Sequence, residues 1–232
     1  MPWETIRKDT PPSVPPNLDD YEKARAAFSW AGARTKLSGL PGGRGLNIGY
    51  EAVDRHAESD HGSAVALRCI GRDDSVTTVT YGQLARSSAQ FANVLCALGL
   101  GRGDRVVTLL GRCPELYTVV LGTLKNTSVL CPLFSAFGPD PVEQRLRISN
   151  ARALVTTAAL YRKKVADRRA LLSELEYVLI IGEGADELPG TVSYEALMAG
   201  AADTFTIPPT SPADMALLHF TSGTTGTPKR SY

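Results

Sequence analysis

Between residues 105 and 199 the sequence alternates short apolar segments with longer amphipathic ones. The apolar segments have the length and the Val, Leu and Ile content of buried strands, and the others have helical periodicity. The predicted strands are Arg105–Leu110, Ser128–Leu133, Ala153–Thr157 and Tyr177–Ile181. The predicted helices are Pro114–Lys125, Pro141–Asn150, Ala158–Leu172 and Tyr194–Ala199. Because helical crossovers join parallel strands, the alternation predicts an α/β fold with a mainly parallel sheet flanked by helices.

The chain before this alternation is less regular. Five prolines in the first 20 residues predict an extended, poorly ordered arm, and Tyr21–Ala33 predicts one short helix. Asn47 is placed to cap a second helix. The apolar face of that helix carries Tyr50, Val53 and Ala57.

A hairpin and a long helix complete this first part. Ala64–Cys69 and Val76–Thr80 have the pattern of two antiparallel strands joined by a polar turn. Thr80 and Gln83 have the spacing of a capping box, so a helix is expected to begin there and to end at Gly99.

Composition excludes several classes of protein. The net charge is only +1, which argues against a nucleic-acid binder, and no apolar run reaches the roughly 18 residues of a membrane span. The first residues lack the apolar core of a signal peptide, so we expect a cytoplasmic protein. The cysteines are widely spaced and are interpreted as buried, small apolar residues that bind no metal: Cys69, Cys96, Cys113 and Cys131.

A hydroxyl-rich loop follows the last apolar run, Met215–Phe220, which predicts a buried strand. Glycines let backbone N–H groups point into one concavity, hydroxyls add neutral donors, and a lysine adds positive charge. Ligands bind at the carboxyl ends of parallel strands, so this loop is predicted to hold a polyphosphate. The predicted phosphate-binding residues are Thr221, Ser222, Gly223, Thr224, Thr225, Gly226 and Lys229. Only two residues separate the two glycines, so this is not the Walker loop, and a plain surface turn is the alternative.

The loop sequence resembles the phosphate loop of the adenylate-forming (AMP-dependent synthetase/ligase) superfamily. Three further stretches are similar to acetate–CoA ligases (acetyl-CoA synthetases, AMP-forming): Asn47–Ala57, Pro114–Tyr117 and Pro132–Phe137. The resemblance extends from about Tyr21 to Lys229. It implies that residues 46–232 are the N-terminal subdomain of an AMP-binding domain, incomplete and ending in the phosphate loop, after a partly disordered arm at residues 1–45.

The resemblance also implies an activity. These ligases join acetate, or a similar short-chain carboxylate, to coenzyme A through an acyl-adenylate, using ATP and Mg²⁺. Residues expected near coenzyme A are Phe134, Ala136, Arg162 and Lys163, although basic residues on a helix are more often only solvated. We expect small-molecule substrates, no nucleic-acid or membrane partner, and neither a catalytic residue nor a metal ligand within these residues.

Three positions depart from the resemblance. Asn126 stands where a glycine is common, so a strained turn is expected there, and Ser135 replaces a common Glu or Gly. Arg230 replaces the glycine after the loop lysine, and this tail is expected to mark a frameshift, premature stop or assembly break. The chain is then expected to be inactive alone. The alternatives are a non-catalytic remnant or interaction module, and a ligase for another short acid such as propionate.

Overall fold

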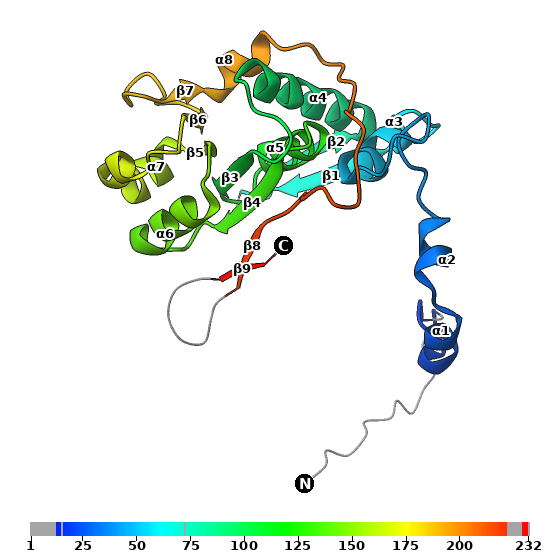
Figure 1. Ribbon diagram of the computed structural model, residues 1–232. Helices are drawn as coiled ribbons and strands as arrows, with labels where there is room; N and C mark the ends of the chain where they lie inside the picture. The colour runs from blue at the N-terminus through cyan, green and yellow to red at the C-terminus, as the bar shows by residue number, and fades with distance from the viewer. Residues whose placement is uncertain (1–12, 15, 72, 222–228, 232) are drawn as a thin grey trace. The chain divides into compact units, whose positions relative to one another are not determined.

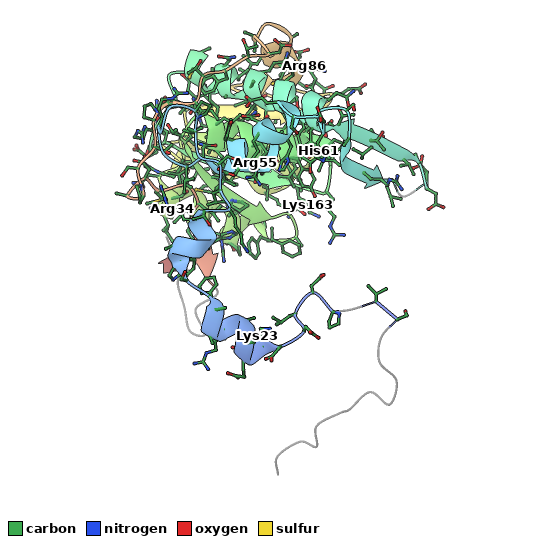
Figure 2. The ribbon with its side chains drawn as sticks, turned by 90° about the vertical axis from the view of Figure 1, so that its right-hand side faces the viewer. Lys23, Arg34, Arg55, His61, Arg86 and Lys163 are labelled. Carbon is green, nitrogen blue, oxygen red and sulfur yellow. The ribbon has the colours of Figure 1, made fainter. Side chains whose placement is uncertain are left out.

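The computed structural model describes residues 13–14, 16–71, 73–221 and 229–231, in two compact units, Met1–Leu37 and Ser38–Tyr232 (Figure 1). The first unit contains helices α1 (Tyr21–Ala27) and α2 (Trp30–Arg34), neither of which has a buried residue. Their side chains, including Lys23 and Arg34 in Figure 2, are mostly exposed. The prediction of a single helix at Tyr21–Ala33 is wrong, because Phe28 is extended and Ser29 caps a new helix. Residues 1–12 and 15, in the extended arm predicted for the first 20 residues, lie outside the described residues.

A five-stranded parallel sheet forms the centre of the second unit, with the order β4–β3–β5–β6–β7. Its strands are β3 (Arg105–Leu110), β4 (Val129–Phe134), β5 (Ala153–Thr157), β6 (Tyr177–Ile181) and β7 (Val192–Ser193). The predicted parallel α/β sheet is confirmed, and its four predicted strands agree with the structure to within one residue. The two-residue strand β7 was not predicted, because it is too short to show a period.

Helices cover both faces of this sheet (Figure 1). On one face α4 (Tyr81–Ala97), α5 (Pro114–Lys125) and α8 (Tyr194–Ala199) bury apolar side chains against the strands. On the other face lie α6 (Pro139–Ser149) and α7 (Ala158–Lys164). The helix predicted at Ala158–Leu172 is shorter than expected, because after Val165 the chain continues as a 3₁₀ turn, η2 (Ala166–Leu171).

The segment before α4 confirms the predicted caps and hairpin. The Asn47 side-chain oxygen accepts hydrogen bonds from the backbone N–H groups of Gly49 and Tyr50. The turns that follow are a π-helix, η1 (Tyr50–Asp54), and α3 (Arg55–Ala57). Strands β1 (Val65–Ile70) and β2 (Val76–Thr80) pair antiparallel, and Thr80 and Gln83 form both bonds of the capping box.

The last segment runs along the free edge of β4. The Leu130 N–H donates to the Ala216 carbonyl at 3.0 Å, and the Leu218 N–H donates to the Leu130 carbonyl at 2.9 Å. Strands β8 (His219–Thr221) and β9 (Lys229–Ser231) then pair antiparallel. The predicted strand Met215–Phe220 is confirmed only in part, because Leu217 is 38% exposed while Leu218 is 2% exposed.

One expectation about individual residues is wrong, and a second is correct for the turn but displaced by one residue. Cys96 is exposed, so the cysteines are not all buried, although Cys131 is fully buried in β4. Asn126 is an unstrained helix cap with φ −66°, and the left-handed residue is its neighbour Thr127, with φ 65°.

No helix in the described part of the chain is long and apolar enough to cross a membrane. Among the same residues, no three His, Cys, Asp or Glu side chains are grouped as metal ligands.

Candidate functional site

The carboxyl ends of β3, β4 and β5, with the segments that follow them, form what we call the carboxyl edge of the sheet. The connection from β3 leads to β4 on one side, and the next strand, β5, lies on the other side of β3. Connections therefore diverge between β3 and β5, which is where ligands bind in open parallel sheets. Residues 216–218 run parallel to β4, so the chain that follows them also reaches the carboxyl edge.

The predicted phosphate loop, residues 221–229, begins and ends in the hairpin β8–β9. Its residues Ser222, Gly223, Thr224, Thr225 and Gly226 lie outside the described residues. The two ends are described in their backbone, where Thr221 pairs with Lys229 across the antiparallel ladder. The pairing brings the two described ends of the loop, Thr221 and Lys229, next to each other.

The β4–α6 loop, residues 135–138, carries part of the predicted coenzyme site. Phe134, at the end of β4, is 66% exposed, and Ala136 is also exposed. Lys164 at the end of α7 donates from its ammonium group to the Phe137 carbonyl at 2.6 Å and to the Ser135 carbonyl. These bonds tie α7 to the loop, and the structure therefore brings the segments that carry Phe134, Ala136, Arg162 and Lys163 together.

Lys164 was missed by the sequence analysis. It is 7% exposed, and burial, followed by the nearby charge of Lys163, lowers the pKa of its ammonium group. The available signal was its position three residues after the buried Tyr161, which places both on the inner face of α7. A run of three basic residues does not by itself show which one points inward.

The two predicted basic residues of α7 differ in their surroundings. A guanidinium nitrogen of Arg162 lies 2.5 Å from a carboxylate oxygen of Glu187, which offsets its charge. Lys163, labelled in Figure 2, is exposed and lies beside Lys164 in the chain. Gly184 (φ +94°) lies against this helix, where an added Cβ would come within 3.2 Å of the Ala158 Cβ.

A cleft of about 340 Å³ opens where β4 and β8 meet at the carboxyl edge. It is lined by Pro132, Leu133, Phe134, Phe137, Arg145, His219 and Phe220. Arg145, also missed by the sequence analysis, is 7% exposed, and its guanidinium carbon lies 4.3 Å from the Phe137 ring centroid. Burial lowers the pKa of Arg145. The cleft joins the stem of the predicted phosphate loop to the predicted coenzyme site.

A larger hollow, about 680 Å³, lies between the end of α6 and residues 171–175. It is at the amino ends of β5 and β6, on the opposite edge of the sheet, and contains none of the predicted site residues. Parallel sheets bind their ligands at carboxyl ends, so its size does not make it the better candidate.

Comparison with known proteins identifies the family of the chain. The family of AMP-binding enzymes matches residues 53–230. An acetyl-coenzyme A synthetase of Bacillus subtilis is 36% identical over 216 residues, which are 92% of this chain and 36% of that protein. One from Syntrophus aciditrophicus is 31% identical over 207 residues, 84% of this chain and 32% of that protein.

The chain is also similar to solved structures of CoA ligases. The crystal structure of a Brucella canis acyl-CoA synthetase matches with a TM-score of 0.78 and 34% identity, over 90% of this chain and 37% of that one. An anthranilate CoA ligase in complex with anthranoyl-AMP matches with a TM-score of 0.67 and 26% identity, over 77% of this chain and 33% of that one. The chain spans about a third of the length of these relatives. With more than half of its residues matched by the family, this chain belongs to the AMP-binding enzymes.

Proposed function

We propose that this chain supplies the ATP-phosphate and coenzyme A contacts of an AMP-forming acid–CoA ligase for acetate or a similar short-chain carboxylate. One observation carries the proposal: the strand that enters the predicted phosphate loop and the loop predicted to meet coenzyme A line the same cleft. Both substrates of a ligase must approach one reaction centre, and a shared cleft at the carboxyl edge permits that. The relatives that match, named as acetyl-coenzyme A synthetases, supply the substrate class.

The proposed reaction has two steps. A carboxylate oxygen attacks the α-phosphorus of ATP, which forms an acyl-adenylate and releases pyrophosphate. The coenzyme A thiol then attacks the acyl carbon, which forms the thioester and releases AMP. Negative charge on the phosphate oxygens must be held throughout, so positioned donors and cations contribute most of what the protein supplies.

We assign the phosphate contacts to the predicted phosphate loop. Its backbone N–H groups and hydroxyls would hold the β- and γ-phosphates, Lys229 would add a positive charge, and Mg²⁺ would share that charge. The proposed phosphate contacts are Thr221, Ser222, Gly223, Thr224, Thr225, Gly226 and Lys229. The proposed coenzyme contacts are Phe134, Ala136, Arg162 and Lys163. The exposure of Phe134 and Lys163 supports the second set.

We also propose that residues 46–232 are part of one AMP-binding domain, with residues 1–45 as an arm. The family match to residues 53–230 supports this division. Use of ATP and coenzyme A favours a cytoplasmic location. We assign no residue here to the chemical steps, and expect these 232 residues alone to bind substrates without turning them over.

Two variants test the site by calorimetric titration of the chain with Mg·ATP and, separately, with coenzyme A. Lys229→Ala should weaken ATP binding by about tenfold, because a charge-assisted contact is lost, and leave coenzyme A binding unchanged. Lys163→Ala should weaken coenzyme A binding and leave ATP binding unchanged. If the unsubstituted chain binds no ATP, or if Lys229→Ala leaves the ATP affinity unchanged, the proposal fails. Pyrophosphate release with acetate or propionate and coenzyme A should be absent for these residues alone, and clear turnover would contradict the expectation that they are inactive.

A further inference from the structure

Four side chains form a continuous row between the end of β4 and β8. The rings of Phe134 and Phe137 meet edge to face, with centroids 5.7 Å apart. The guanidinium carbon of Arg145 lies 4.3 Å from the Phe137 centroid and 5.7 Å from that of Phe220. Arg145, on α6, therefore stands between an aromatic ring of the β4–α6 loop and one in the strand that enters the predicted phosphate loop.

Arg145 is held by rings and a carbonyl group rather than by a carboxylate. One guanidinium nitrogen donates to the Pro141 carbonyl at 3.0 Å, and the buried Nε has no hydrogen-bond partner in the described part of the chain. The acidic residues nearby are bound elsewhere: Glu143 pairs with Arg147 and Arg168, and Asp140 with Arg168. Stacking on aromatic rings is thus the main interaction that offsets the burial of this charge, and it is strongest when water is excluded.

The β4–α6 loop has a second anchor on its other side. The Lys164 ammonium group bonds two of the loop's carbonyls, so the loop backbone is fixed by α7 while its Phe137 ring is fixed by α6. On β8, the ring of Phe220 faces the Arg145 guanidinium, with 5.7 Å between the guanidinium carbon and the ring centroid. A displacement of the guanidinium would therefore change its packing against both the β4–α6 loop and β8.

We propose that Arg145 is a positioning residue that couples the β4–α6 loop to β8, so that a ligand at one segment changes the affinity for a ligand at the other. This inference rests on the proposed function, which places coenzyme A at the loop and the ATP phosphates beyond β8. Its physical basis is one cation shared between two rings, which transmits a displacement in either direction.

The coupling can be tested first without any ligand, by amide hydrogen exchange. Arg145→Met should speed exchange in peptides covering residues 133–138 and 216–220 together, and leave peptides from β5 and β6 unchanged. Arg147→Met, on the same helix but with a side chain that is 63% exposed, is the matched control and should change neither. Faster exchange everywhere would mean a merely structural role, and a change in one peptide alone would mean no coupling; either result overturns the proposal.

A second test measures coupling between ligands. The dissociation constant of Mg·ATP is determined by calorimetry with and without saturating coenzyme A, and we expect it to change by about fivefold or more. The ratio of the two dissociation constants, without and with coenzyme A, should fall to about one in Arg145→Met. Arg145→Lys should retain part of the coupling, and Arg147→Met should retain all of it. An unchanged ratio in Arg145→Met overturns the proposal. If neither ligand binds the unsubstituted chain, the proposed function fails, and the exchange experiment alone decides whether Arg145 links the two segments.

Discussion

Several cationic side chains near the two edges of the sheet differ in their partners, with an exception at each edge: Arg105 at the amino edge donates to backbone carbonyls, and Arg162 at the carboxyl edge pairs with Glu187. At the amino edge, Arg152 lies 2.9 Å from Asp104 and 2.7 Å from Glu176, and Lys125 lies 2.5 Å from Asp54. At the carboxyl edge, Arg145 and Lys164 are held by aromatic rings and backbone carbonyls. A cation paired with a carboxylate has its net charge cancelled locally, whereas a cation held by rings and carbonyls keeps a net positive charge that contributes to the local electrostatic potential. The net positive charge of Arg145 and Lys164 is compatible with the phosphate contacts that we propose at the carboxyl edge.

The two buried lysines show this contrast in one residue type. The Lys125 side chain is 2% exposed and joins α5 to Asp54 of η1 and to the Ala85 carbonyl of α4. Burial is the largest influence on that pair: it raises the pKa of Asp54 and lowers that of Lys125. Lys164 joins only a helix to the loop beside it. The first fixes the packing of three elements, and the second fixes one loop.

The largest effect is expected from Lys125→Met. The substitution keeps the apolar stem but leaves the Asp54 carboxylate partly buried without its partner. Breaking such a pair typically lowers the free energy of unfolding by about 3–5 kcal/mol. Urea denaturation followed by circular dichroism would measure the change.

A double variant makes this test sharper. Asp54→Leu combined with Lys125→Met removes both charges, so it should recover much of the lost stability. Lys163→Met, an exposed lysine of α7, is the control for loss of a positive charge and should change stability little. If Lys125→Met lowers the free energy of unfolding no more than the control does, the stability of the amino edge does not depend on this charge pair. The proposed difference between the two edges would then be wrong.

Lys164→Met should have a smaller effect, confined to the carboxyl edge. The Ser135 and Phe137 carbonyls lose a donor, but water reaches this partly exposed loop, so the expected loss is about 1 kcal/mol. Amide exchange in residues 135–138 should rise, while α4 and α5 stay protected. A loss in the free energy of unfolding as large as that of Lys125→Met would show that the two buried lysines contribute equally to stability.

The strands, the long helices and the caps were predictable because their signals are local. Apolar periodicity identified β3, β5 and β6, and a three-residue spacing identified the Thr80 cap. The contacts that set the two edges apart were not predictable. Asp54 and Lys125 are 71 residues apart, and periodicity does not say which polar side chain points inward. The strained turn expected at Asn126 exists, but its left-handed residue is Thr127, because the backbone dihedrals depend on how the helix end meets β4.

Thr127 allows the amino edge to be tested without any charge. It is β-branched yet adopts φ 65°, a conformation that costs such residues about 1–2 kcal/mol. Thr127→Gly should therefore raise the free energy of unfolding, by about 0.5–1 kcal/mol after the greater flexibility of glycine in the unfolded chain is counted. Thr127→Ala, which loses the side chain but keeps the strain, is the control. No gain in the glycine variant relative to the alanine variant would mean that the turn is not strained.

The smallest effect concerns Glu176 and its pH dependence. Hydrogen bonding to Arg152 lowers the pKa of Glu176 below its ordinary value of 4.5. A carboxylate whose pKa is lower in the folded state stabilises the protein above its unfolded pKa, and this contribution disappears as the pH falls through the folded pKa. The chain should therefore be slightly more stable than Glu176→Gln near neutral pH, and the difference should shrink as the pH falls below 4.5 and vanish once the pH is below the folded pKa.

Urea denaturation at several pH values would follow that difference. Glu174→Gln is the matched control, since Glu174 is exposed and its carboxylate accepts a hydrogen bond from the neighbouring Ser173 hydroxyl at 3.3 Å. It shows what the loss of a neighbouring carboxylate does when no arginine pair is broken. A Glu176→Gln difference that persists unchanged into acid would mean that the carboxylate charge is not what Arg152 recognises. The amino edge would then be held by packing and backbone contacts, and paired charge would no longer distinguish it from the carboxyl edge.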